Sequence, residues 1–143
     1  RKGIYAKDDY SRFELAGKIY SPSYISLETV LAECGVVFQK YRTVFVVSYL
    51  TRQIRVADLA ISYRKIKDEV LFNTRGIETK NTINIASCER AFLDAVFIYK
   101  DYHFDNLRPL NWDKISELKK IYKSKIFEKR VEEYYKLSKE EHG

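Results

Sequence analysis

One stretch of the sequence can be accommodated in few ways: residues 91–99, AFLDAVFIY, are apolar or aromatic at every position except Asp94. Ser87 lies where it can cap a helix, and Glu89 falls in the first turn, where a carboxylate interacts favourably with the helix dipole. A helix that is apolar around most of its circumference has to be covered on nearly all sides. The chain has 143 residues, 45% of them hydrophobic, which is enough for one domain with such a core.

Asp94 is the charged exception within this buried helix. An unpaired carboxylate in a protein interior is costly and tends to take up a proton. Asp94 is therefore either an active-site acid or part of a structural pair with an arginine or with backbone amides. Because no second catalytic group stands beside it in the sequence, we expect the structural pair.

Residues 18–35, KIYSPSYISLETVLAECG, predict a joint followed by a helix. Pro22 disfavours a helical conformation at the residue before it, and Ser23 can cap the helix that follows. Gly35 occupies the position of a left-handed C-cap. Glu28 falls off the apolar stripe of this helix, which consists of Leu27, Val30, Leu31 and Cys34.

An earlier helix, which Asp8 and Asp9 can cap, would precede this joint. The two helices together predict a helix–turn–helix-like pair docked on the core. The pair lacks exposed basic residues, which argues against a role as a DNA-reading helix.

The middle of the chain predicts strands. Residues 43–50, TVFVVSYL, are β-branched and aromatic, as is typical of a central strand. Two alternating runs follow with a phase change near Ala57 and Asp58, which predicts a hairpin, and a further extended pair would turn at Gly76 and Asn81.

The whole pattern predicts an α+β fold for residues 1–143: a single domain with a small, mostly antiparallel sheet and helices before it, packed on it and after it. Residues 111–143 form the C-terminal helices in this prediction, with Asn111 as a cap and a break near Ser124. Residues 1–6 read as the end of a strand whose partner would lie upstream.

The formal net charge is +6, and the excess lies in the middle of the chain. Residues 36–80 contain nine lysines and arginines against four acidic residues. Basic side chains gain affinity for nucleic acid by displacing counterions from phosphates, although a basic sheet face can also serve solubility alone. The candidate phosphate contacts are Arg52, Arg55, Arg64, Lys65 and Lys67.

Metal, cofactor and membrane functions find little support in the sequence. Cys34 and Cys88 lack the spacing of a zinc site or a disulfide framework, so we expect two buried apolar thiols in a reducing compartment. His103 and His142 are isolated, and no glycine-rich phosphate loop is present. No apolar stretch approaches the roughly 20 residues of a membrane span. We therefore expect no metal, no cofactor and no membrane contact.

The order of the motifs RKGIYA, LAGKIYSPSYISLETVLAECGVV, ISYRKIK and ASCERAFLDAVF resembles the AbiEi antitoxins, the regulator half of bacterial AbiE abortive-infection systems. The likeness covers residues 1 to about 99. Cys88 departs from the family pattern, in which proline often follows the capping residue. The residues that we interpret as the structural signature of the family are Ser23, Leu27, Glu28, Gly35, Ser87, Glu89 and Asp94.

The resemblance implies a function as well as a fold. Antitoxins of this family join an N-terminal winged helix to a larger C-terminal domain, and residues 1–6 would end the wing. The resemblance implies a cytoplasmic, non-enzymatic antitoxin of a type IV system. Such a protein would counteract a nucleotidyltransferase toxin, which it need not touch, and would contribute to operator DNA binding and autoregulation.

Two alternatives remain at this stage. A metal-dependent nuclease could use Asp58 with a Glu-x-Lys motif at Glu78 and Lys80, a layout that can hold a cation and orient water. A non-catalytic module that binds an acidic protein would use the same basic face, since arginine and aromatic residues also suit protein interfaces.

Overall fold

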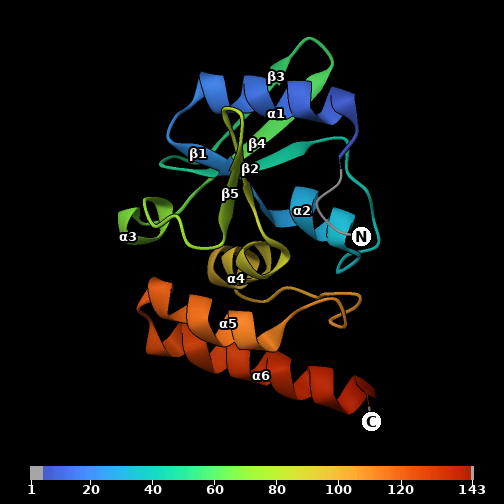
Figure 1. Ribbon diagram of the computed structural model, residues 1–143, viewed down its shortest axis with the longest axis vertical. Coiled ribbons are helices and arrows are strands. Elements are labelled where there is room, and N and C mark those ends of the chain that lie inside the picture. Colours follow the sequence, from blue (N-terminus) through green and yellow to red (C-terminus); the bar gives the residue numbers. More distant parts are fainter. Residues whose placement is uncertain (1–4, 143) are drawn as a thin grey trace.

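In a computed structural model, the chain forms one six-stranded sheet with helices on both faces (Figure 1). The structure describes the backbone of residues 5–142 and the side chains of residues 5–140. The strands are β1 (Ser23–Ile25), β2 (Val44–Ser48), β3 (Arg52–Val56), β4 (Leu59–Lys65), β5 (Ile77–Lys80) and β6 (Ile83–Ala86). The helices are α1 (Lys7–Ile19), α2 (Leu27–Cys34), α3 (Asp68–Leu71), α4 (Cys88–Tyr99), α5 (Trp112–Leu118), the 3-10 helix η1 (Lys119–Tyr122) and α6 (Lys125–His142).

The sheet order is β3-β4-β2-β1-β6-β5. Three of its pairings are antiparallel, β1 with β2, β3 with β4 and β5 with β6, and two are parallel, β2 with β4 and β1 with β6. The apolar strand β2 lies inside the sheet, as its sequence predicts. The mostly antiparallel sheet and the helices around it confirm the predicted α+β fold.

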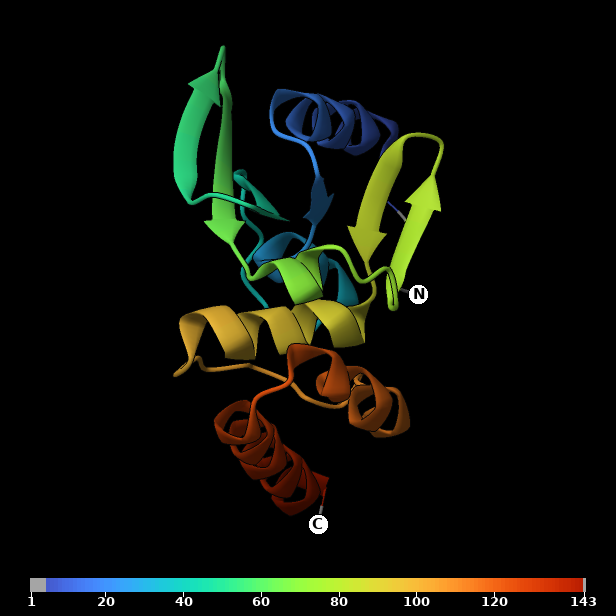
Figure 2. The same ribbon diagram turned by 90° about the vertical axis from the view of Figure 1, so that its left-hand side faces the viewer.

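The β3–β4 and β5–β6 hairpins lie on either side of α1 (Figure 2). Phe13 and Ala16 of α1 are buried against the sheet. Tyr63 of β4 is fully buried and donates a hydrogen bond of 2.6 Å to the backbone oxygen of Ala16. Alternation along the strands places the odd-numbered residues of β4 on this side of the sheet.

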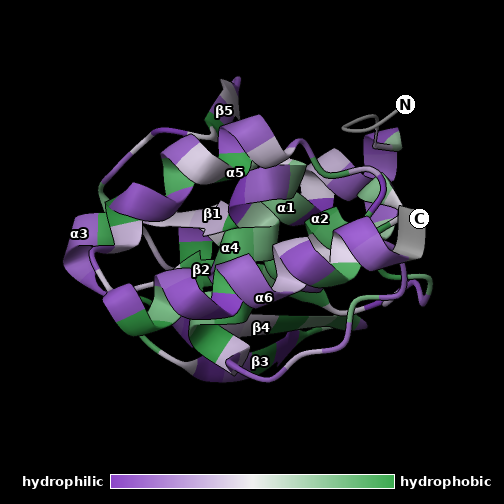
Figure 3. Cartoon of the chain, turned by 90° about the horizontal axis from the view of Figure 1, so that it is seen from below, coloured by the Kyte–Doolittle hydropathy of each residue, from purple (hydrophilic) through white to green (hydrophobic). Residues whose placement is uncertain are grey.

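Helices α2 and α4 pack on the opposite face of the sheet. Every residue of α4 from Cys88 to Val96 is buried, because the sheet and α2 cover one side and α5, η1 and α6 cover the other (Figure 1). Seen from below, hydrophilic residues alternate with apolar ones along α5 and α6 (Figure 3). The chain between them turns at Lys123, whose φ is 49°, next to the predicted break at Ser124.

The predicted helix–turn–helix-like pair is wrong, because strand β1 separates α1 from α2. Ser23 does not cap a helix: it pairs with Ser48 in the sheet, and Ser26 occupies the N-cap position of α2. The local capping signal is weak, whereas β1 gains backbone pairing with β2 on one side and β6 on the other.

The prediction for residues 1–6 lies mainly outside the described residues, which begin at Tyr5. Ala6 is the N-cap of α1, and its N–H donates to the Asp9 carboxylate over 3.1 Å. Within residues 5–142, no helix is long and apolar enough to cross a bilayer.

Candidate nucleic-acid interface

The β3–β4 hairpin carries the predicted basic residues. Arg52 pairs with Tyr63 and Arg55 pairs with Ala60, so the two strands run antiparallel over their whole length. The hairpin turns where the sequence predicts it, with Ala57 in a left-handed conformation (φ 55°). All five candidate phosphate contacts lie on this hairpin or immediately after it.

Strand alternation divides these residues between two faces of the sheet. Arg52 and Lys65 lie on the same face as Tyr63, beside α1. The Arg52 guanidinium donates to the Tyr20 hydroxyl over 3.1 Å and lies 5.8 Å from the centre of that ring. The Arg52 side chain is therefore already engaged by Tyr20 within the chain, although it is exposed.

Arg55 and Arg64 lie on the other face. The Arg64 guanidinium lies 5.0 Å from the centre of the Tyr99 ring of α4, and Lys67, just beyond β4, lies 5.5 Å from the ring of Phe97. Both cations are half-buried and stack on aromatic rings. Arg55 remains exposed.

A hollow of about 430 Å³ lies on this second face, around Arg55. Phe45 lines it and packs edge to face against Tyr41, with 5.3 Å between ring centres. A guanidinium can bind a phosphate through two parallel N–H bonds, and a ring edge nearby can contact a sugar or base. We name this surface the open face; its residues are Thr43, Phe45, Gln53, Arg55, Ala60 and Ser62.

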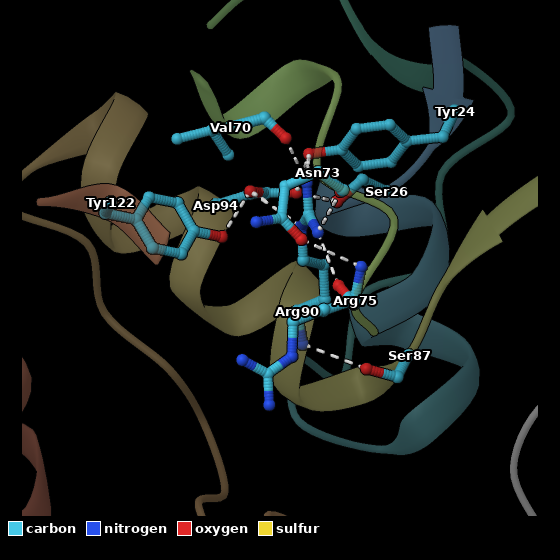
Figure 4. A network of polar contacts seen from close by, with 9 residues as sticks. All are labelled: Tyr24, Ser26, Val70, Asn73, Arg75, Ser87, Arg90, Asp94 and Tyr122. Carbon is cyan, nitrogen blue, oxygen red and sulfur yellow. Dashed lines mark hydrogen bonds and ion pairs between the residues drawn. The ribbon is translucent and has the colours of Figure 1, made fainter. Parts of the chain in front are cut away.

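Two of the signature residues, Ser87 and Asp94, lie in a buried polar network away from the hairpin (Figure 4). Ser87 caps α4 by accepting from the backbone N–H of Arg90 over 3.1 Å, as predicted. The Arg90 side chain is fully buried. Its guanidinium donates to the backbone oxygens of Val70 (2.7 Å), Asn73 (2.8 Å) and Arg75 and to the Tyr24 hydroxyl (3.1 Å).

Asp94 has the structural partners that its burial requires (Figure 4). It pairs with Arg90 one turn earlier, with 3.9 Å between Nε and Oδ1. Three hydroxyl groups donate to its carboxylate, from Tyr24 (2.9 Å), Ser26 (2.8 Å) and Tyr122 (2.6 Å). Burial raises the pKa of Asp94, while the Arg90 guanidinium and these hydroxyl donors lower it. The expected structural pair is confirmed.

The sequence reasoning missed Arg90, although its position four residues before Asp94 is a readable signal for an ion pair on one helix face. It also missed Tyr24 of β1, Ser26 at the N-cap of α2 and Tyr122 of η1. Nothing local in the sequence links these hydroxyl groups to Asp94.

Glu28 was predicted to lie off the buried stripe of α2, and this is wrong, since only 7% of it is exposed. Its carboxylate accepts from the hydroxyls of Tyr99 (2.7 Å) and Tyr102 (3.2 Å). Burial and the Glu28 charge raise the pKa of both tyrosines, so both remain donors. The segment from Tyr99 to Tyr102 covers the side of α2 that carries Glu28. The apolar periodicity of α2 does not indicate that this side is covered.

The remaining signature residues also have structural roles. Gly35 adopts the left-handed conformation predicted for a C-cap, with φ 82°. Leu27 is fully buried. Glu89 is buried and accepts from the backbone N–H of Asn111 over 3.0 Å, which connects α4 to the cap of α5.

Cys34 and Cys88 form a disulfide, so the prediction of two free thiols is wrong. Their Cα atoms are 6.2 Å apart, because the end of α2 packs against the start of α4. The two residues are separated by 54 positions, and helix packing rather than a spacing motif brings them together. Cys88 is buried, as predicted, whereas Cys34 is half-buried.

The residues proposed for a nuclease do not meet. Asp58 lies in the turn of the β3–β4 hairpin, while Glu78 and Lys80 lie on β5 at the other edge of the sheet. In the part of the chain that the structure describes, no group of three or more His, Cys, Asp or Glu side chains could hold a metal ion. His103 is exposed beside Asp105 at 3.7 Å, and the side chain of His142 lies outside the described part.

Comparison of the chain with protein-family models, with curated proteins and with solved structures found no match in any of the three.

Proposed function

We propose that this chain is the C-terminal domain of an AbiEi-type antitoxin. It would act in the cytoplasm without catalysis, counteract a nucleotidyltransferase toxin and assist an N-terminal winged-helix domain in binding operator DNA. One observation carries the proposal: the two most specific motifs of the resemblance, residues 20–35 and 89–94, meet in one buried network. Tyr24 and Ser26 from the first motif donate to Asp94 from the second.

This meeting supports the resemblance because the two motifs are far apart in the chain. Short motifs can arise by chance, but chance does not require that their polar residues complete each other's hydrogen bonds in the core. These residues therefore help to specify the fold, and the antitoxin function is proposed by analogy with the family that the motifs resemble.

The growth of cells that express the toxin tests the proposal directly. The chain is co-expressed with the nucleotidyltransferase encoded beside its gene, and colony formation is compared with an empty vector and with the full-length antitoxin. We expect rescue by the chain. Failure of both proteins to rescue would overturn the assignment, and rescue by the full-length protein alone would move antitoxicity to the winged-helix domain.

The open face is the proposed contributor to DNA binding. Arg55 is exposed beside a ring-lined hollow, so it can approach a phosphate without leaving a buried partner. Such a contact positions a protein on DNA and carries no base information.

Two charge reversals of equal size separate this face from the opposite one. Arg55→Glu changes the open face, and Lys65→Glu changes the side of the same hairpin that faces α1. We expect Arg55→Glu to weaken binding to duplexes of any sequence and to reduce the salt slope by about one unit, as loss of one phosphate contact does. Fluorescence anisotropy at several salt concentrations measures both. Equal effects of the two reversals would remove the open face from the proposal.

A protein-interaction module is the second candidate, and exposed aromatic residues favour it. Phe38 and Phe72 are 67% and 64% exposed. Large apolar side chains at a surface often mark a protein contact. If Arg55→Glu leaves DNA binding unchanged but abolishes capture of an acidic partner protein, this candidate replaces the DNA role.

A further inference from the structure

The Cys34–Cys88 disulfide opens onto a surface groove. The groove has a volume of about 780 Å³. It is bounded by β5, β6, the start of α1, the C-terminal end of α2 and the N-terminal end of α4. Both cysteines line it, together with Tyr5, Tyr10 and Lys114. A small solute thiol can therefore reach the bond without unfolding of the core.

The two sulfur atoms have different surroundings. Cys34 ends α2 and is half-buried, so it presents the accessible side of the bond. Cys88 is 2% exposed and is the first residue of the twelve-residue helix α4, next to the capping Ser87. The start of a helix stabilises a thiolate through the helix dipole, and the end of a helix does not.

This difference assigns the direction of exchange. An attacking thiolate reaches the half-buried Cys34 more easily than the buried Cys88. The thiolate that leaves then forms at the first residue of α4, where the helix dipole offsets part of the cost of its burial. We propose that Cys34–Cys88 is a redox-active disulfide, opened and closed by low-molecular-weight thiols of the glutathione class through a mixed disulfide on Cys34.

The exchange takes place in two steps. The solute thiolate attacks Cys34 Sγ; a new S–S bond forms, the Cys34–Cys88 bond breaks, and its electron pair remains on Cys88 Sγ as a thiolate. A second solute thiolate attacks the solute sulfur of the mixed disulfide and releases Cys34 as a thiolate. One protein disulfide is thus reduced by two electrons while two solute thiols become one disulfide, and the reverse sequence closes the bond.

The consequence is a reversible covalent link between α2 and α4, close to the buried network. In a reducing compartment the link would be open, and it would close when the thiol pool is oxidised. This inference stands independently of the proposed antitoxin function.

Incubation of the whole chain in glutathione buffers of increasing oxidised fraction tests the inference. Samples are quenched with acid, alkylated and mapped by mass spectrometry without reduction. We expect reversible conversion between two thiols and the Cys34–Cys88 disulfide. Thiols that remain free in the most oxidising buffer, or a disulfide that resists the most reducing one, would overturn the proposal.

Two variants test the assignment of the attacked sulfur. With oxidised glutathione, Cys88→Ser should accumulate a stable adduct at Cys34, at least about tenfold faster than Cys34→Ser forms one at the buried Cys88. Circular dichroism verifies that both variants fold. If either does not, the reduced wild-type chain is pulsed with iodoacetamide, and Cys34 should be alkylated first. Faster modification of Cys88 in either experiment would contradict the assignment.

Discussion

Helix α4 and the β3–β4 hairpin both contain arginines, but the two regions use them in opposite ways. Arg90 is fully buried and donates to three backbone oxygens and a tyrosine hydroxyl, beside the Asp94 carboxylate. Arg55 is exposed on the open face. The same side chain is thus part of the framework in one region and a candidate contact in the other, and burial rather than residue type separates the two roles.

The difference also decides what each charge costs to remove. A buried ion whose partner is deleted stays in a medium that cannot solvate it, whereas an exposed ion is hydrated in any case. Substitutions in α4 should therefore reduce stability, and substitutions on the open face should change binding while leaving the fold intact.

The largest effect is expected from Asp94→Ala. The change leaves the Arg90 guanidinium without its counter-charge and removes the acceptor of three hydroxyl groups, so the free energy of unfolding should fall by about 3–5 kcal/mol. Urea denaturation followed by circular dichroism measures this loss, with Asp101→Ala at an exposed position as the control. A loss below about 1 kcal/mol would place Asp94 among the dispensable charges and end the contrast with the hairpin.

The next effect concerns the covalent link beside α4. Opening the Cys34–Cys88 disulfide removes a constraint across 54 positions, and we expect a loss of about 2–4 kcal/mol, mainly because the unfolded chain gains freedom. Urea denaturation with and without dithiothreitol measures it. The double variant Cys34→Ser with Cys88→Ser should not respond to the reductant; a response of equal size in that variant would show that the link contributes nothing.

A smaller effect is expected from the titration of Tyr63, on the face of β4 that packs against α1. The Tyr63 hydroxyl faces α1, and burial followed by the neighbouring Tyr20 raises the pKa of Tyr63 from 10.0 to about 12. Between these values the unfolded chain has lost the proton while the folded chain keeps it, so stability should fall as the pH rises. The slope is about 1.4 kcal/mol per pH unit.

Urea denaturation at pH values from 9 to roughly 12 tests this titration. Tyr63→Phe removes the ionisable group, so its stability should decline with a slope smaller by that amount, although it also loses the hydrogen bond to Ala16. Equal slopes in the two proteins would mean that Tyr63 does not titrate in this range.

The features that could be predicted from the sequence are those that a local pattern determines. The burial of α4, the Ser87 cap, the left-handed Gly35 and the turn of the β3–β4 hairpin each depend on a few adjacent residues, and all four were confirmed. The errors at Ser23, Glu28 and Cys34 have a common cause. The structural role of each residue depends on a partner far away in the chain. Ser23 pairs with β2, Glu28 accepts from the Tyr99 hydroxyl, and Cys34 bonds to Cys88.

The candidate site was predictable in composition but not in geometry. The five basic residues are visible in the sequence, yet their division between two faces follows from the pairing of β3 with β4. That Arg64 stacks on Tyr99, while Arg55 does not share this anchor, depends on where α4 crosses the sheet. Sequence alone therefore treats as equivalent two arginines that the fold makes different.

The smallest predicted effect tests this last distinction within one hairpin. Arg64→Ala removes a half-buried cation from the face of the Tyr99 ring, which should cost about 0.5–1 kcal/mol, whereas Arg55→Ala should change stability by less than about 0.5 kcal/mol. Thermal unfolding of the two variants side by side measures the difference, and DNA affinity is measured on the same samples. If Arg55→Ala is the less destabilised variant and the one that binds DNA more weakly, framework and contact are separated on one face of one sheet. If Arg64→Ala loses more stability and also more DNA affinity than Arg55→Ala, the stacked arginine would itself be the DNA contact. Burial would then no longer separate framework arginines from contact arginines.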